Sequence, residues 1–431
     1  QNVLAWSSTA VSAVWSNPAN WTTVSGTPGP TPTINDIVLL GDRAVPFQPT
    51  LNSAAQTKGI TFGSASAITL TIGSGGSLTV QGNIEGTWSS DMTHTIAVGA
   101  QTLTTFSDLE LSKGVANRRI NVTVSTGTIN VSGSLVQSGN ADITFTDAGV
   151  LNIGGDYNYT TGTFTPATGS VKYNGINDQV VAPLTYHHLN IDKAFGVAST
   201  VALTSVTGNL IMGTSGGQLD LGGTLNVTGN VLIGTGAILN SISSPINVAG
   251  NWTTTGTFIP GLGTVTFNGG GAQTVNTTTF NDLTINKAGG TLTVLGNLGI
   301  NGNISVQAGT VDVSSFSVTR SVLGGSASLN AAGTARFGGA GFQLINFAVL
   351  VADPASTIEF YGGASRPIPP VSYGHLTITG GGTISMVGPT SVLGNLTINP
   401  GTTLQLPTTT LTLLGNVVNN GTLDATPGSL I

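Results

Sequence analysis

The chain has 431 residues and a formal net charge of −6, and 6% of its residues are charged whereas 39% are hydrophobic. Disordered proteins combine low hydrophobicity with high charge, so this composition excludes disorder. The 62 glycines do not recur at every third position, which excludes collagen. The most apolar run, residues 344–352, is too short for a membrane helix and contains Asn346, so we expect no transmembrane segment. No basic patch is present, so we expect no nucleic-acid partner.

The first 50 residues differ in composition from the rest of the chain. They hold three of the five tryptophans, Trp6, Trp15 and Trp21, and six of the 18 prolines. Because a stack of repeats must cover its open end, we predict that residues 1–50 form an N-terminal cap or docking segment. The chain begins at Gln1, as a mature secreted protein does after its signal peptide is removed, so we expect an extracellular, cell-surface location.

A long repeat follows from about residue 169. Three segments, 169–175, 263–269 and 356–362, read GSVKYNG, GTVTFNG and STIEFYG. Thirteen residues after the aromatic residue of each segment a second block begins, and its copies are YHHLNI at 186–191, FNDLTI at 280–285 and YGHLTI at 373–378. These blocks start 94 and 93 residues apart, so a unit of about 94 residues repeats along the chain. An earlier copy of the second block, FSDLEL, stands at 106–111.

A shorter repeat lies inside the long one. Gly-Asn pairs recur every 21 residues, in VTGNL at 206–210, VTGNV at 227–231 and VAGNW at 248–252, and again in LGNL at 393–396 and LGNV at 414–417. Short segments with alternating apolar residues, such as Leu219–Leu221 and Leu283–Ile285, lie between them and predict strands. Gly-Asn pairs are turn signals, because both residues tolerate a positive φ.

A strand-and-turn period of 21 residues predicts one coil of a parallel β-helix. We therefore expect an all-β protein in which residues 51–431 form a right-handed parallel β-helix, or β-solenoid. Asn209, Asn230 and Asn251 are then expected to stack as an amide ladder. A string of antiparallel sandwiches of about 93 residues is the alternative, but it explains only the long period.

The residues that carry chemistry are few. The chain has no cysteine, three glutamates and no adjacent aspartates, so we predict no catalytic, metal-binding or cofactor-binding residue and no enzymatic activity. His187 and His188 are neighbours on a predicted strand, and such neighbours point to opposite faces, which does not favour a shared metal site. The position of His188 is Asp or His in the other copies, which indicates an outward-facing site.

Two further sets of repeated residues have structural and functional interpretations. Lys113, Lys193 and Lys287 each follow the leucine of the second block by four residues, and we interpret them as charges at strand ends that discourage edge-to-edge aggregation, with a ligand role as the alternative. Aromatic residues recur in both blocks, and we expect them to stack in the core, with an exposed carbohydrate-stacking face as the alternative. This aromatic set is Tyr173, Tyr186, Phe267, Phe280, Phe360 and Tyr373.

Several motifs resemble those of a known group of proteins. The segments GNWTTTGTF at 250–258, GTVTFNG at 263–269 and FNDLTINK at 280–287 resemble the β-strand repeats of large bacterial cell-surface and adhesin-like proteins, and WSNPANW at 15–21 with NDIV at 35–38 is similar to the entry segment of such β-helical domains. The resemblance covers about residues 150–400. It implies a surface location and an adhesive or structural role, and it carries no catalytic residues over to this chain.

Three hypotheses of function follow. The first is a non-enzymatic structural protein, a subunit of a self-assembling extracellular filament, sheath or layer that joins head to tail with copies of itself through terminal strands or coil ends. Its basis is a charge-poor surface and a repeat pattern that continues from Gly415 almost to Ile431 without a polar cap. The second is an adhesin rod that binds glycans or a host surface. The third is a polysaccharide-active β-helix enzyme, which the scarcity of paired carboxylates disfavours.

Overall fold

The computed structural model describes residues 1–340, 343–426 and 429–430. Its strands pair in parallel with strands one coil earlier and one coil later, so the predicted all-β parallel solenoid is confirmed and the sandwich alternative is wrong. The described residues contain one short 3₁₀ turn, η1 (Pro18–Asn20), and no α-helix. The chain divides into two compact units, unit 1 with residues 1–223 and 234–238 and unit 2 with residues 224–233 and 239–431.

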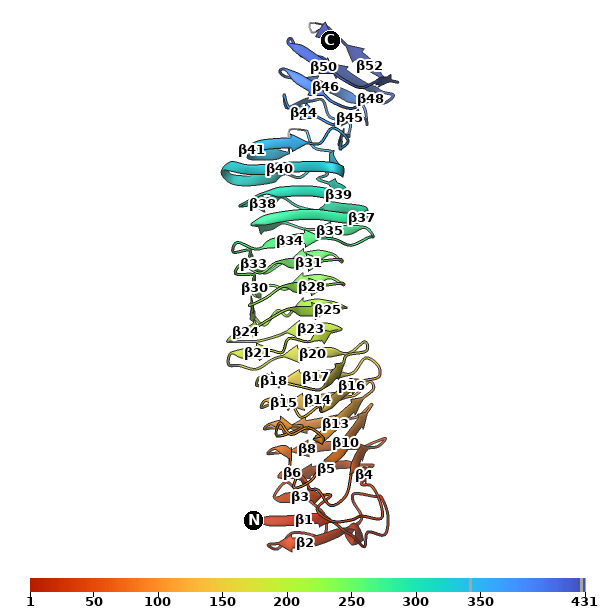
Figure 1. Ribbon diagram of the computed structural model, residues 1–431, viewed down its shortest axis with the longest axis vertical. Coiled ribbons are helices and arrows are strands. Elements are labelled where there is room, and N and C mark those ends of the chain that lie inside the picture. The colour runs from red at the N-terminus through yellow and green to blue at the C-terminus, as the bar shows by residue number, and fades with distance from the viewer. Residues whose placement is uncertain (341–342, 427–428, 431) are drawn as a thin grey trace. The chain divides into compact units, whose positions relative to one another are not determined.

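In unit 1 each coil contributes a strand to each of three parallel stacks, which Figure 1 shows in red to yellow. The first stack holds β3 (Asp36–Leu40), β6 (Gly59–Phe62), β9 (Ile84–Gly86), β12 (Leu109–Glu110), β15 (Leu135–Gln137) and β18 (Tyr157–Tyr159). The second holds β4 (Thr50–Leu51), β7 (Thr69–Ile72), β10 (Met92–Gly99), β13 (Arg118–Val124), β16 (Asp142–Phe145) and β19 (Thr163–Thr165). The third holds β5 (Ala54–Thr57), β8 (Ser77–Val80), β11 (Thr102–Thr105), β14 (Thr128–Val131), β17 (Val150–Ile153), β20 (Ser170–Tyr173) and β23 (His188–Ile191). Later coils of the unit add β21 (Gln179–Val181), β22 (Thr185–Tyr186), β24 (Val197–Thr200), β25 (Thr204–Val206), β26 (Leu210–Met212) and β27 (Gln218–Leu221).

Unit 2 begins with short strands and continues with much longer ones. The short strands are β28 (Leu225–Val227), β29 (Val231–Ile233), β31 (Ile246–Val248), β32 (Trp252–Thr254), β33 (Thr257–Ile259), β34 (Thr264–Phe267), β35 (Gln273–Val275), β36 (Thr278–Phe280) and β38 (Leu298–Ile300). The long strands are β37 (Asp282–Val294), β39 (Ile304–Asp312), β40 (Val318–Phe337) and β41 (Leu344–Ala352). Short coils then resume with β42 (Thr357–Phe360), β43 (Arg366–Ile368), β44 (Ser372–Tyr373), β45 (His375–Ile378), β46 (Gly382–Met386), β47 (Thr390–Val392), β48 (Leu396–Ile398), β49 (Thr402–Gln405), β50 (Thr410–Leu413), β51 (Val417–Asn419), β52 (Thr422–Asp424) and β53 (Ser429–Leu430).

The core is a set of aliphatic columns that run through the stacked coils. In one column of unit 1, Leu103, Ile129, Leu151, Val171 and Leu189 stand directly in register, and each is at most 2% exposed. Alternate residues of these strands face outward, as the two-residue period predicts. Burying one such side chain contributes about 1.5–3 kcal/mol, so the repeated columns are the main source of stability.

The predicted aromatic core is also confirmed. The two aromatic residues of each long repeat are buried against one another: the Tyr173 and Tyr186 hydroxyls lie 3.0 Å apart, and the Phe267–Phe280 and Phe360–Tyr373 ring centroids lie 6.3 Å and 6.2 Å apart. All six side chains are at most 1% exposed. The alternative of a carbohydrate-stacking face made by these residues is therefore wrong.

The Gly-Asn pairs mark the coil turns for a different reason from the predicted one. Neither Gly250 nor Asn251 has a positive φ. A Cβ on Gly250 would instead lie 2.2 Å from the carbonyl oxygen of Gly229 in the preceding coil, so glycine is required by the close stacking of backbones. The expected amide ladder takes a different form as well, because the backbone N–H of Asn251 donates to Oδ1 of Asn230 at 2.8 Å.

The N-terminal segment is organised around the three tryptophans. Strand β1 (Asn2–Trp6) pairs in parallel with β3 on one edge and antiparallel with β2 (Trp21–Ser25) on the other, so β2 covers the outer edge of the first coil. The rings of Trp6, Trp15 and Trp21 contact one another at centroid distances of 4.7–6.4 Å. Parallel pairing thus already includes β1 and β3 within residues 1–50.

At the other end of the chain, the predicted uncapped coil includes residues 427–428 and Ile431, which lie outside the described residues. In the part of the chain that the structure describes, no helix has the length and apolar character needed to cross a membrane.

Candidate functional site

The ionisable residues that could carry chemistry are dispersed. Among the described residues, no three His, Asp or Glu side chains come together in a way that could hold a metal ion. The rings of His187 and His188 contact each other at a centroid distance of 4.3 Å, although neighbours on a strand were expected to point apart. Burial, followed by the charge of His187, lowers the pKa of His188.

The repeat position of His188 has one role in four copies. Nδ1 of His188 accepts the backbone N–H of the following coil at 3.0 Å, and Nδ1 of His375 does the same at 2.9 Å. Oδ1 of Asp108 and Oδ1 of Asp282 accept the equivalent N–H groups at 2.7 Å. Asp and His exchange at this position because either one supplies an acceptor for the next coil, which is a structural function.

The lysines of the second block correct the sequence interpretation. Lys113 is exposed and forms an ion pair with Glu85 at 3.0 Å, as a solvated lysine does. Lys193 and Lys287 are instead buried, at 0% and 1% exposed. They protect no sheet edge, because their stems turn into the coil and their ammonium groups bind backbone carbonyls there.

Each buried lysine forms what we call a Lys–Gln clamp. Nζ of Lys193 donates to Gly175 O, Asn177 O and Gln179 Oε1, each at 2.7 Å. The same Gln179 oxygen also accepts the backbone N–H of Gly175 at 2.9 Å. The clamp therefore fixes both the carbonyls and an N–H of the turn that follows β20 and connects it to β21.

Unit 2 repeats the clamp with the same pattern. Nζ of Lys287 donates to Gly269 O, to Gly271 O at 2.9 Å and to Gln273 Oε1, and Gln273 Oε1 accepts Gly269 N–H at 3.0 Å. Burial lowers the pKa of Lys287, as it does that of Lys193. A glutamine six residues after the aromatic of the first block, and a lysine fourteen residues later, is the sequence signal for this clamp.

In a third copy of the repeat, one arginine stands in place of the Lys–Gln pair. Arg366 stands at the position of Gln179 and Gln273, whereas Gly380 stands at the lysine position. The Arg366 side chain is 3% exposed, and its Nη2 donates to Phe337 O at 2.7 Å and to Tyr361 O at 2.9 Å. The guanidinium thus takes over the bond that Gln179 Nε2 donates to Ile153 O in unit 1 and adds a bond to the turn, and burial lowers its pKa.

Two surface features lie outside these internal clamps. The first, which we call the asparagine groove, is a groove of about 470 Å³ on unit 1. It is lined by the ends of β14 and β17 and by the clamped turn after β20, with Asn130, Asn152, Asn174 and Asn177 among its residues. Nδ2 of Asn152 donates to Oδ1 of Asn130 at 2.7 Å, so a true amide ladder runs along one side of the groove.

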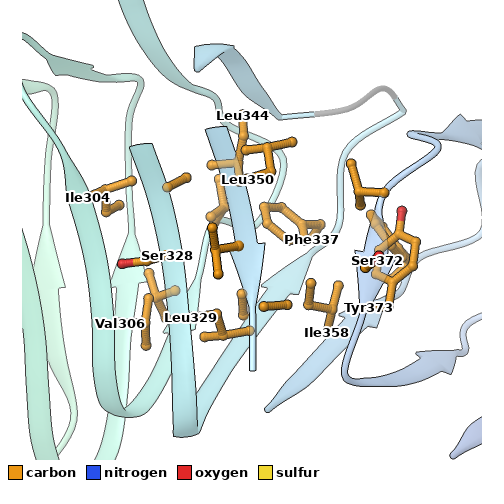
Figure 2. A pocket seen from close by; sticks show the side chains of 18 residues that line it. Ile304, Val306, Ser328, Leu329, Phe337, Leu344, Leu350, Ile358, Ser372 and Tyr373 are labelled. Atoms are coloured by element: carbon orange, nitrogen blue, oxygen red, sulfur yellow. The ribbon is translucent and has the colours of Figure 1, made fainter. Parts of the chain in front are cut away.

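The second feature is the free edge of β41 in unit 2. Within the described residues β41 pairs along one edge, in parallel with β40, while the next strand, β42, pairs with the last residues of β40. Beside β41 lies a cavity of about 60 Å³ with almost wholly apolar walls. Figure 2 shows Leu344 and Leu350 of β41, Phe337 of β40 and Tyr373 of β44 around this cavity.

Comparisons with protein-family models, with curated proteins and with solved structures give no match for this chain. The fold therefore defines its class directly: the chain is a repeat protein of the parallel β-solenoid type.

Proposed function

We propose that this protein is an extracellular structural subunit that associates with copies of itself through strand pairing at the free edge of β41. The observation that carries the proposal is a nine-residue strand, LINFAVLVA, that has no charge and leaves one edge of its backbone unpaired within the described residues. A long, apolar and open strand edge is a template for the strand of another chain.

The side chains of β41 support this association on both faces of the strand. Ile345 and Val349 point outward and are 41% and 49% exposed. Leu344 and Leu350 line the apolar cavity on the other side. A strand added beside β41 would pair with its open backbone edge, and its alternate side chains would pack next to those of β41 on each face.

A second copy of the chain is the partner that fits best. An added strand must have few charged side chains, because a charge beside the apolar walls would lose its hydration at a cost in free energy. This chain has 28 charged residues in 431, and β41 itself has none. The sequence predicts joining through terminal strands or coil ends, and β41 supplies an internal edge at which the same kind of joining can occur.

The test compares three forms of the full chain by sedimentation velocity and negative-stain electron microscopy over a range of concentrations. The wild type is expected to associate as concentration rises, and Val349→Lys is expected to stay monomeric because a lysine on the edge opposes strand addition. Val136→Lys is the control, since Val136 lies on β15, which pairs in parallel with both β12 and β18.

Two results would overturn the proposal. One is a wild-type protein that stays monomeric at every concentration. The other is a Val349→Lys protein that associates as the wild type does, because the free edge of β41 would then not be the joining surface.

A further inference from the structure

The asparagine groove presents hydrogen-bonding groups without charge. Its lining consists of Asn, Ser, Gly, Val and Ile residues. The side-chain amides of Asn174 and Asn177 are exposed and have no hydrogen-bond partner among the described residues, so each offers a donor and an acceptor to a ligand. Its volume lies within the range of small-molecule sites, about 300–1,000 Å³.

The charges nearest the ladder neutralise each other. Lys172 stands beside Asn152 in the register of β17 and β20, and its Nζ lies 2.5 Å from Oδ2 of Asp192. The hydrogen bond from Lys172 holds the pKa of Asp192 below its usual value, so the pair stays ionised and closed at neutral pH. The residues that line the groove carry no charge themselves, so a charged ligand finds no counter-ion among them.

The wall of the groove is held rigid from inside the coil. Asn174 and Asn177 belong to the turn that the Lys193–Gln179 clamp fixes through Gly175 O, Asn177 O and Gly175 N–H. The clamp is buried, so a ligand in the groove would meet side chains whose backbone is already in place. Such preorganisation lowers the entropy that binding costs.

An apolar surface adjoins the amides. Ile176 lines the groove and is 68% exposed. Gly196 of the next coil lies directly over Asn177, since an added Cβ would be 2.7 Å from the Asn177 carbonyl carbon. Neutral amides beside an exposed apolar side chain match a ring that has hydroxyl groups on its rim and C–H groups on its face.

We propose that the asparagine groove is a binding site for neutral oligosaccharides. Asn130 and Asn152 line one side of it, Asn174 and Asn177 bind the sugar hydroxyls, and Ile176 packs against the ring face. This site is on unit 1 and uses none of the residues of β41. Sugar binding and self-association can therefore be tested separately, and the failure of one does not affect the other.

The chain contains its own matched comparison. In unit 2 the ladder recurs, with Nδ2 of Asn247 donating to Oδ1 of Asn226 at 2.8 Å, and Asn268 follows the aromatic as Asn174 does. The turn there has Gly270 and Gly271 in place of Ile176 and Asn177. The second copy therefore has the amide ladder of the site without its exposed isoleucine or its second free amide.

The experiment uses the full chain with cellopentaose, maltopentaose and chitopentaose as neutral probes and a pentamer of galacturonic acid as the charged probe. Binding is measured by isothermal titration calorimetry and by saturation-transfer NMR at millimolar sugar. One or more neutral probes are expected to bind with one site per chain. Both Asn174→Ala and the pair Ile176→Gly/Asn177→Gly are expected to weaken binding about tenfold, the equivalent of about 1.4 kcal/mol.

A gain-of-function variant tests the same inference from the other side. A Cβ added at Gly270 or Gly271 meets no atom within 4 Å, and neither residue has a positive φ, so Gly270→Ile/Gly271→Asn fits the existing backbone. This variant is expected to raise the stoichiometry from one site to two. The proposal is overturned if no neutral probe binds, if binding survives the Asn174 and Ile176/Asn177 changes, or if the charged pentamer binds more tightly.

Discussion

The Lys–Gln clamp of unit 2 allows a sharp prediction about stability. Lys287→Met keeps an apolar stem in the coil and removes the ammonium group that binds Gly269 O, Gly271 O and Gln273 Oε1. Leaving a buried acceptor without a donor costs about 1–3 kcal/mol, while removal of a buried charge returns part of its desolvation cost. We therefore expect Lys287→Met to lower the free energy of unfolding of the surrounding coils by about 2–4 kcal/mol.

The assay is urea unfolding followed by tryptophan fluorescence. Trp252 is buried in unit 2 on β32 and pairs with Val275 of β35, the strand that begins at Gln273, so its emission reports on the clamped coils. Lys113→Met is the control, because Lys113 occupies the same repeat position but is exposed beside Glu85. Exposed ion pairs contribute about 0–1 kcal/mol, so this change is expected to shift the midpoint little.

A rescue variant copies the third repeat. Gln273→Arg/Lys287→Gly reproduces the arrangement of Arg366 and Gly380, and it is expected to recover part of the stability that Lys287→Gly alone loses. Recovery is partial, because Nε and Nη1 of Arg366 are buried without partners in the described structure. Two results would refute the reasoning: a Lys287→Met effect as small as that of Lys113→Met, or a double variant no more stable than Lys287→Gly.

Two further predictions concern pH and backbone stacking. His94 is 0% exposed, its Nε2–H donates to Gly63 O at 2.8 Å and its Nδ1 accepts Ile68 N–H at 3.2 Å, and burial lowers its pKa to about 4. As pH falls, His94 binds a proton in the unfolded chain before it does so in the folded one. The free energy of unfolding is therefore intact above about pH 6.5 and falls by about 3 kcal/mol as pH drops to 4. Urea midpoints across this range should decline more steeply for wild type than for His94→Gln, and equal slopes would contradict this role of His94. Gly250→Ala places a Cβ against Gly229 O and should lower the thermal unfolding temperature by several degrees. Gly270→Ala places its Cβ in open space and should leave the temperature unchanged. Similar temperatures for both variants would show that the coils move apart to admit the extra methyl group.

Much of the fold follows from short-range patterns in the sequence. The two-residue alternation in segments such as Leu283–Ile285 predicted strands with one buried face, and the 21-residue recurrence of Gly-Asn predicted the coil. The six repeated aromatics were predicted to stack in the core, and they do. These predictions hold because a parallel stack brings the same position of successive coils together, so a periodic sequence specifies its own contacts.

The features that bear on function depend on contacts outside that period. Lys193 follows β23 and Lys287 lies within β37, and both continue the phase of the buried residues before them. A lysine can occupy such a position only where acceptors surround its ammonium group, and carbonyls of a turn one coil earlier supply them. The glycines of the Gly-Asn pairs are required by the distance to the neighbouring backbone, which no single coil determines.

The sequence by itself determined that this protein is an all-β solenoid with an aromatic and aliphatic core, because each of those properties repeats along the chain. The tertiary structure alone decided where the repetition is broken. The free edge of β41 arises because β42 pairs with β40 instead, and the asparagine groove lies where the clamped turn after β20 comes beside the ends of β14 and β17. Both depend on which distant segments become neighbours in the folded chain, and the local sequence does not show this.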